Sequence, residues 1–325
     1  MLIPEPSDEI RIARIEIDRR VFPLRKPYVL SFVTLNEYTS ILATITTEQG
    51  IRRSAEVVPL PGYSDESEED ILAYLAEEST HLKGLSLCAA RTLVEKKTAR
   101  QPFSTSPLLT AIDLFDWLPP DTIEKRSMVL PCSTSTPEEV QSAAEQALFS
   151  GRTLKIKLSG DPDRDLTGLA ALKSITIGEV RLDANQAYDY DSATKLIGGL
   201  IKYGIHEKLA YFEQPFDKEE WGAAIRLNNC HPEIPVMLDE TVITDSDVQR
   251  ACDAGFKFLK LKLFKQGGIR ETLRQAEAAH QSGVHVIMGN GVATHLANDI
   301  ENALIQQHAS WFWGDSEANG FEKLA

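Results

Sequence analysis

The chain has 325 residues, 42% of them hydrophobic, which is enough for a sizeable core in one large domain or two ordinary ones. Its 48 acidic and 34 basic residues give a net charge of −14, which excludes nucleic acid and anionic membranes as favoured partners. No apolar run reaches the roughly 18 residues of a membrane span, the N-terminus lacks signal-peptide features, and the cysteines are scattered, so we expect a cytoplasmic location.

The first 125 residues predict an α+β unit. Strand-like runs cover residues 10–17, 40–47 and 51–58. Ser67 and Asp70 have the spacing of a capping box, which places the start of a helix there. A second helix is expected over 106–118, where Pro119 and Pro120 stop it. Three strands with helices indicate a small mixed domain.

From residue 126 onward, short strands alternate with helices at intervals of about 25–30 residues, the size of one βα unit. Strands are predicted near 128–133, 153–158, 179–184, 208–213, 235–239, 257–263, 284–289 and 310–314. Helices are predicted near 136–149, 164–174, 190–202, 217–229, 245–253, 269–281 and 293–308. The pattern predicts an α/β fold, a (β/α)7β TIM-like barrel over residues 126–325 with a short C-terminal tail. A doubly wound sheet is the alternative, but no Gly-x-Gly-x-x-Gly follows an early strand.

Two predicted strands carry lysine pairs. Lys155 and Lys157 share one strand face and lie opposite leucine and isoleucine. Lys260 and Lys262 do the same against the leucines at 259, 261 and 263. Either strand alone could place its lysines in water. Because acids face inward on the strands between these two, we expect the lysines to face inward as well.

Each of three intervening strands ends in an inward acid: Asp183, Glu213 and Asp239. Active sites of such barrels lie at the C-terminal strand ends, so these acids should form an arc between the lysine pairs. Three carboxylates in a partly desolvated mouth repel one another by several kcal/mol on the order of Coulomb estimates. A divalent cation removes that repulsion, and all-oxygen ligands favour Mg²⁺, with Mn²⁺ as an alternative.

A structural alternative is a buried salt-bridge network in which the acids pair with Lys155, Lys260 and Arg181. The catalytic interpretation gives the lysines a role. A lysine near other cations should have a lowered pKa and can act as a base. A metal that polarises a substrate carboxylate stabilises the enediolate formed when the adjacent carbon loses its proton. Either epimerisation or dehydration can follow.

Several short motifs together resemble the enolase superfamily, in particular its muconate-lactonising-type subgroup. The matching motifs are Lys155-Ile-Lys157, Asp183-Ala-Asn185, Glu213-Gln-Pro215, Asp239-Glu240 and Leu261-Lys-Leu-Phe-Lys-Gln-Gly-Gly268. The resemblance implies a capping domain over residues 1–125, covering the barrel mouth. It implies Asp183, Glu213 and Asp239 as Mg²⁺ ligands. It also implies Lys157 and Lys262 as catalytic lysines, with supporting roles for Lys155, Arg181, Asn185 and Glu240.

The loop Pro59-Leu-Pro-Gly-Tyr-Ser-Asp-Glu-Ser67 resembles the capping loop of o-succinylbenzoate synthases within that superfamily. This implies a small-molecule carboxylate substrate contacted by Leu60, Gly62 and Tyr63, and loss of water from 2-succinyl-6-hydroxy-2,4-cyclohexadiene-1-carboxylate. The alternative for the loop alone is a proline-stiffened turn. Backbone N–H groups at Asn290 and Gly291 could hold the succinyl carboxylate, and the alternative for this segment is an ordinary glycine-rich turn between a strand and a helix.

The main rival is an isomerase, either a dipeptide epimerase or an N-succinylamino acid racemase. Dipeptide epimerases of this superfamily carry Asp-x-Asp after the last strand to hold the substrate ammonium. Here Asp315-Ser316-Glu317 is close to that pattern. The sequence carries no signal for the oligomeric state.

Overall fold

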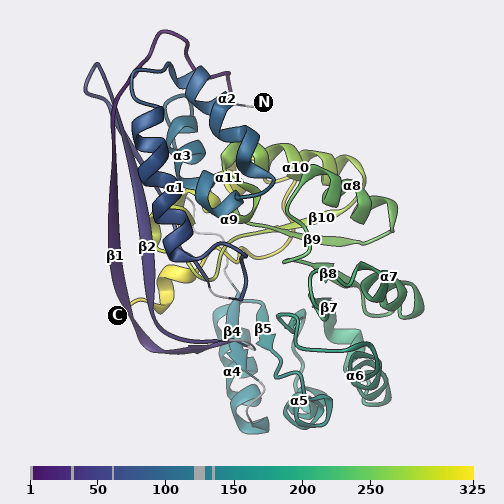
Figure 1. The fold of residues 1–325 in the computed structure, drawn as a ribbon. Helices are drawn as coiled ribbons and strands as arrows, with labels where there is room; N and C mark the ends of the chain where they lie inside the picture. Colours follow the sequence, from purple (N-terminus) through teal and green to yellow (C-terminus); the bar gives the residue numbers. More distant parts are fainter. Residues whose placement is uncertain (1–2, 31–32, 61, 121–128, 134–135) are drawn as a thin grey trace.

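The computed structural model describes residues 3–30, 33–60, 62–120, 129–133 and 136–325. Figure 1 shows an N-terminal part, built from a long antiparallel sheet and helices, packed against a parallel sheet with helices along its outside. The predicted boundary between residues 125 and 126 lies outside the described residues. None of the helices in the described part of the chain is long and apolar enough to cross a membrane.

The N-terminal sheet has the order β1-β2-β3 and is antiparallel throughout. Its strands and helices are β1 (Ile12–Val29), β2 (Thr34–Thr47), β3 (Arg52–Val57), α1 (Glu68–His81), α2 (Leu87–Thr98) and α3 (Pro102–Asp113). The capping box is present: Ser67 Oγ accepts from Asp70 N at 3.1 Å, and Ser67 N donates to Asp70 Oδ2 at 3.0 Å.

One helix in this part was predicted with wrong bounds, and another was missed. The helix expected over 106–118 is α3, which begins at Pro102 because proline fits the first helical turn without loss of a hydrogen bond. It ends at Asp113, whose buried carboxylate accepts from Arg91 at 3.0 Å and from Arg270 at 2.8 Å. Arg270 belongs to the barrel, so this ion pair fastens α3 to it. Helix α2 was not predicted.

The parallel sheet has the order β10-β9-β8-β7-β6-β5-β4. Its strands are β4 (Leu130–Ser133), β5 (Leu154–Lys157), β6 (Val180–Asp183), β7 (Leu209–Glu213), β8 (Val236–Leu238), β9 (Phe258–Leu261) and β10 (His285–Met288). Its helices are α4 (Pro137–Ser150), α5 (Pro162–Leu169), α6 (Tyr190–Lys202), α7 (Trp221–Cys230), α8 (Asp245–Asp253), α9 (Leu263–Gln266), α10 (Ile269–Gln281) and α11 (His295–Gln307), with 3₁₀ turns η1 (Ala170–Ser174), η2 (His206–Lys208) and η3 (Gly320–Lys323). The predicted α/β barrel class with an N-terminal cap is confirmed.

The predicted eighth strand near 310–314 is only a parallel bridge between Phe312 and Val286 of β10. The segment nevertheless spans the gap between the two ends of the sheet. Trp313 N donates to Val286 O at 2.8 Å, and on the other side Val129 N donates to Ser316 O at 3.1 Å. The gap is therefore spanned by an irregular segment that forms an isolated bridge in place of a continuous ladder.

A second correction concerns the end of β9. This strand was expected to run to residue 263, with Leu263 on the same face as Leu259 and Leu261. It ends at Leu261, and Leu263 begins the short helix α9. Lys262 thus lies at the junction between strand and helix, at the rim of the barrel.

Candidate active site

The strand-end residues chosen from the sequence converge on one cavity. The parallel register pairs Lys157 with Asp183 and Asp183 with Glu213, so their Cα atoms lie side by side at the strand ends. The cavity spans about 660 Å³ including its open mouth. Its wall includes Lys155, Lys157, Asp183, Asn185, Glu213, Asp239, Lys260, Lys262, Asn290 and Gly291.

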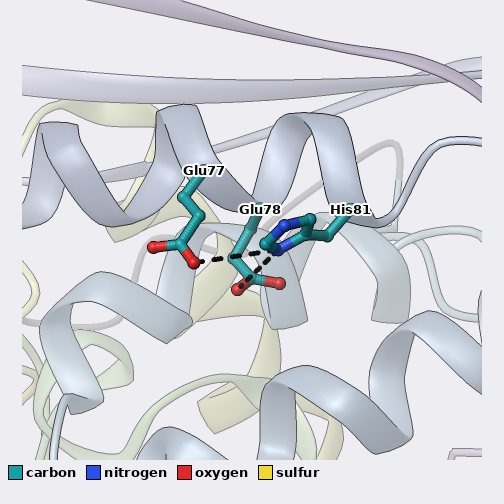
Figure 2. A group of neighbouring side chains, drawn as sticks. All are labelled: Glu77, Glu78 and His81. Atoms are coloured by element: carbon teal, nitrogen blue, oxygen red, sulfur yellow. Dashed lines mark ion pairs between the residues drawn. The ribbon is translucent and has the colours of Figure 1, made fainter.

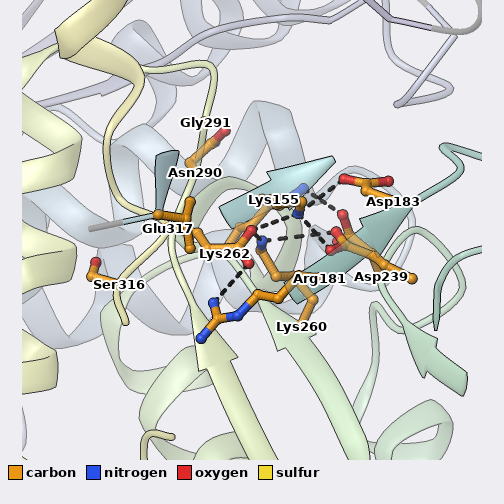
Figure 3. Close-up of polar contacts among 12 residues, drawn as sticks. Lys155, Arg181, Asp183, Asp239, Lys260, Lys262, Asn290, Gly291, Ser316 and Glu317 are labelled. Atoms are coloured by element: carbon orange, nitrogen blue, oxygen red, sulfur yellow. Dashed lines mark hydrogen bonds and ion pairs between the residues drawn. The ribbon is translucent and has the colours of Figure 1, made fainter. Parts of the chain in front are cut away.

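Lys155 lies at the centre of the charged groups (Figure 3). Its Nζ is 2.9 Å from Asp183 Oδ2 and 2.5 Å from Glu213 Oε2, so one ammonium joins two of the three acids. Burial lowers the pKa of Lys155, but these carboxylates outweigh it and the net pKa lies well above its usual value. Lys155 is therefore a fixed cation that holds the acids together, which agrees with a supporting role.

Glu317 is a member of this group that sequence reasoning did not assign. Its carboxylate contacts Lys155 at 2.6 Å, Arg181 at 3.0 Å and Tyr211 Oη at 2.9 Å, and it also binds Lys260. Arg181 is fully buried beneath the cavity and does not line it. The salt-bridge network considered as a structural alternative is thus present, but its centre is Glu317, which itself lines the cavity.

Lys157 contacts Asp183 Oδ2 at 2.5 Å and Asn185 Oδ1 at 2.7 Å. Burial lowers the pKa of Lys157, yet the Asp183 carboxylate more than offsets this and the net pKa lies above the usual value. This differs from the sequence expectation that neighbouring cations would lower it. The reason is that the direct contact with Asp183 acts on the ammonium more strongly than the neighbouring charge of Lys155, which also contacts that carboxylate.

Lys262 enters the cavity from the opposite side. Its Nζ is 2.6 Å from Asp239 Oδ2 and 2.7 Å from Tyr63 Oη, and Tyr63 Oη also donates to Asp239 Oδ1 at 2.9 Å. The capping loop thereby reaches directly into the charged cluster. Lys265 binds Asp239 O and Lys260 O, lies 3.1 Å from Asp239 Oδ1, and is not among the described residues that line this cavity, whereas Lys260 and Lys262 both line it.

The turns after β6 and β7 are strained. Asn185, Gln186 and Gln214 have positive φ angles of 42°, 67° and 37°, which are uncommon for non-glycine residues and are often found at functional sites. Gln214 Oε1 accepts from Asp239 N at 2.9 Å and so positions the third acid. Asn185 Nδ2 donates to Glu240 Oε1 at 3.3 Å, which links the two predicted supporting residues.

The predicted substrate contacts are only partly brought together. Leu60, Tyr63, Asn290 and Gly291 line the cavity. Gly62 is exposed and lies outside the lining, where its φ of 83° serves the turn of the capping loop. The cavity wall also contains residues that the sequence did not single out: Tyr28, Leu30, Val58, Phe103, Asn319 and Lys323.

Asp183, Glu213 and Asp239 fit a magnesium ion in their chemistry. Each is 1% exposed and offers only oxygen ligands. Burial and the nearby Asp183 raise the pKa of Glu213 to about 8 despite the contact with Lys155, and a divalent cation would favour the charged form of this carboxylate. Oxygens of the three acids do not all lie within 4.8 Å of one another, so a shared ion requires the side chains to draw closer.

A second acidic group lies on α1 (Figure 2). Potential ligand atoms of Glu77, Glu78 and His81 all lie within 4.8 Å of one another. Lys97 Nζ already contacts Glu78 at 2.5 Å, and Glu77 and His81 are exposed. Because Lys97 already balances the buried Glu78, this cluster needs no metal.

Comparison with known proteins places this chain in a family. Residues 136–323, more than half of the chain, match the family described as "Enolase C-terminal domain-like". The chain therefore belongs to the enolase superfamily. Its N-terminal antiparallel sheet and parallel barrel are the fold of that superfamily, whose members bind Mg²⁺.

Individual relatives have different activities. Muconate cycloisomerase 1 of Pseudomonas putida is 27% identical over 82% of this chain and 76% of its own length. The o-succinylbenzoate synthase of Thermosynechococcus vestitus is 25% identical over 74% of each chain. A dipeptide epimerase from Methylococcus capsulatus, solved with Mg and the dipeptide L-Arg-D-Lys, has a TM-score of 0.79 at 22% identity, and the match covers 97% of this chain and 92% of that chain. These relatives are enzymes, but this chain is about equally identical in sequence to each of them, so sequence identity does not decide which of their activities it shares.

Proposed function

We propose that this chain is a Mg²⁺-dependent o-succinylbenzoate synthase of menaquinone biosynthesis. It would remove water from 2-succinyl-6-hydroxy-2,4-cyclohexadiene-1-carboxylate. The observation that carries the proposal is the pair of lysines on opposite flanks of the acid arc: Lys157 beside Asp183, and Lys262 beside Asp239. Two ammonium groups placed in this way can address both faces of a carbon whose carboxylate lies between them.

Lys157 in its neutral form would take the proton from the carbon next to the ring carboxylate, which requires that Asp183 no longer pair with its ammonium, because that contact raises the pKa of Lys157. Lys262 would stay protonated and face the developing negative charge, because Asp239 raises the pKa of Lys262 despite its burial. The proton on Lys157 would then pass to the departing hydroxyl, which leaves as water. A magnesium ion held by Asp183, Glu213 and Asp239 would supply Lewis-acid stabilisation of negative charge at the substrate carboxylate. Aromatisation of the ring drives the reaction.

The rival dipeptide epimerase needs free acids after the last strand to hold a substrate ammonium. Here the Glu317 carboxylate is occupied by Lys155, Lys260, Arg181 and Tyr211. Asp315 Oδ2 accepts from Thr153 N at 2.8 Å, and Asp315 is not among the described residues that line the cavity. These contacts support the synthase over the dipeptide epimerase. The N-succinylamino acid racemase stays as the alternative, since it would use the same two lysines.

The test is an absorbance assay on purified protein with Mg²⁺. The hydroxycyclohexadiene acid should be converted to an aromatic product that absorbs in the ultraviolet. Lys157→Ala should abolish turnover but leave folding and Mg²⁺ binding intact. Lys173→Ala, which removes an exposed lysine that lies over the Tyr203 ring, is the matched control and should behave as wild type.

Other outcomes would decide against the proposal. Near-normal turnover in Lys157→Ala would show that the assigned base is wrong. Exchange of the α-proton of N-succinylamino acids for deuterium, without dehydration of the cyclohexadiene acid, would identify an isomerase. Turnover of muconate alone would point to the reaction that names the Pseudomonas putida relative.

A further inference from the structure

Lys323, from the C-terminal turn η3, lines the same cavity as the catalytic residues. Its Nζ donates to Gly291 O at 2.8 Å and lies 4.7 Å from the centroid of the Tyr28 ring. Four other lysines line the cavity, and each has a carboxylate within 4.0 Å: Lys155, Lys157, Lys260 and Lys262. Among the described residues, Lys323 forms no such ion pair, which leaves its charge available to a ligand.

The groups around Lys323 surround a small space. A Cβ atom built on Gly291 would lie 3.7 Å from Lys323 Nζ, 3.8 Å from Tyr28 Oη and 4.0 Å from Asn319 Oδ1. Glycine at this position therefore leaves room between an ammonium and a phenol hydroxyl, both of which can donate to an anion. The neighbouring wall contains the apolar side chains of Leu30 and Val58, which suit a short methylene chain.

The charge of the cavity also favours an anion. Five lysines and four carboxylates line it, although the chain as a whole carries a net charge of −14. Burial, followed by the positive charge of Lys157, lowers the pKa of Lys323 to about 7. A negative group placed beside Lys323 would relieve this unfavourable interaction, whereas a cationic group would worsen it.

We propose that Lys323, with Tyr28 and the space beside Gly291, binds the substrate carboxylate that is remote from the reacting carbon. The inference rests on the proposed function and deepens it, because it makes a substrate with two anionic groups the preferred class. The first carboxylate lies between the catalytic lysines, and the second ends an arm that passes Leu30 and Val58. Peptides whose remote end is cationic are disfavoured at the same place.

The experiment compares two ligands by calorimetry in the presence of Mg²⁺. o-Succinylbenzoate carries the remote carboxylate, and o-butyrylbenzoate has a methyl group in its place. Wild type should bind the first at least tenfold more tightly. Lys323→Met should lose most of that preference, with binding of o-butyrylbenzoate changed less than twofold. Lys323→Arg should retain the preference, and Lys173→Met, which removes an exposed lysine over the Tyr203 ring, should match wild type.

Turnover gives a second readout. Lys323→Met should raise KM for the cyclohexadiene acid about tenfold with little change in kcat, because the lysine is remote from the reacting carbon. If wild type prefers o-succinylbenzoate and Lys323→Met prefers it equally, the inference is overturned and the proposed function stands. If wild type binds neither ligand and turns over no cyclohexadiene acid, the proposed function fails and this inference fails with it.

Discussion

Replacing Glu317 by glutamine should be one of the most damaging conservative changes in this chain. Glu317 is 3% exposed, and its carboxylate balances Lys155, Lys260 and Arg181 at once. Without it, Lys155 keeps Asp183 and Glu213, but the nearest remaining carboxylate oxygen to Lys260 is Glu213 Oε1 at 3.8 Å. Removal of one partner from a buried ion pair costs about 3–5 kcal/mol.

The lower end of that range is expected because Lys260 can release its proton. Burial already lowers the pKa of Lys260, and loss of Glu317 would lower it further. A lysine whose folded-state pKa lies below its unfolded-state pKa destabilises the fold while charged. The penalty shrinks as pH rises through the folded-state pKa, where only the unfolded chain still holds the proton. Glu317→Gln should therefore lose about 3 kcal/mol at pH 7 and visibly less at pH 9.

The measurement is equilibrium urea unfolding followed by circular dichroism at both pH values. Glu322→Gln is the matched control, since Glu322 pairs with Arg152 at 2.8 Å on the surface, and exposed pairs contribute about 0–1 kcal/mol. Equal stability of the two variants would refute the account of Glu317 as the central counter-ion. A Glu317→Gln deficit that grows toward pH 9 would refute the role given to Lys260.

Three further outcomes are expected. Mg²⁺ at about 100 times its Kd should stabilise the protein by about 2.7 kcal/mol in thermal unfolding, and chelation or Asp183→Asn should remove that gain; an unchanged melting temperature on chelation would count against the ligand set. Tyr63→Phe should lower kcat about 10–100-fold, because it removes hydrogen bonds to two charged groups, Asp239 and Lys262. An unchanged kcat in Tyr63→Phe would show that Tyr63 lines the cavity without contributing to turnover. Binding of o-succinylbenzoate should weaken about tenfold from pH 6 to pH 8, because Lys323 loses its proton near pH 7. Lys157 disfavours the charged form of Lys323, and Glu322 favours it. Lys323→Arg should flatten this pH profile, and an equally steep profile in Lys323→Arg would show that another group titrates.

The sequence predicted the parts of the site that depend on strand periodicity. Alternation of two residues places Lys155 and Lys157 on one face and puts Asp183 and Glu213 at strand ends, where the register pairs them. Metal binding and the catalytic roles of these residues remain predictions. Strand alternation predicted only that these residues lie close together.

The residues missed by sequence reasoning come from segments without a regular period. Glu317 and Lys323 follow the irregular segment that closes the barrel, so no alternation rule could place their side chains. Leu263 was misplaced because its apolar character continues the strand pattern, although the chain has already begun to coil into α9. Gln214 could have been suspected only from its neighbour Glu213, since its positive φ leaves no trace in composition.

The segment that carries Lys323 also joins the chain's two parts. Immediately after it, Leu324 forms an antiparallel bridge with Leu24 of β1, and Ala325 N donates to Pro23 O at 2.9 Å. Substitutions that adapt this segment to a new ligand would also disturb its attachment to β1. Evolution of ligand preference at this position is therefore more constrained than in an unattached loop, and neighbours such as Leu30 and Val58 offer freer routes to diversification.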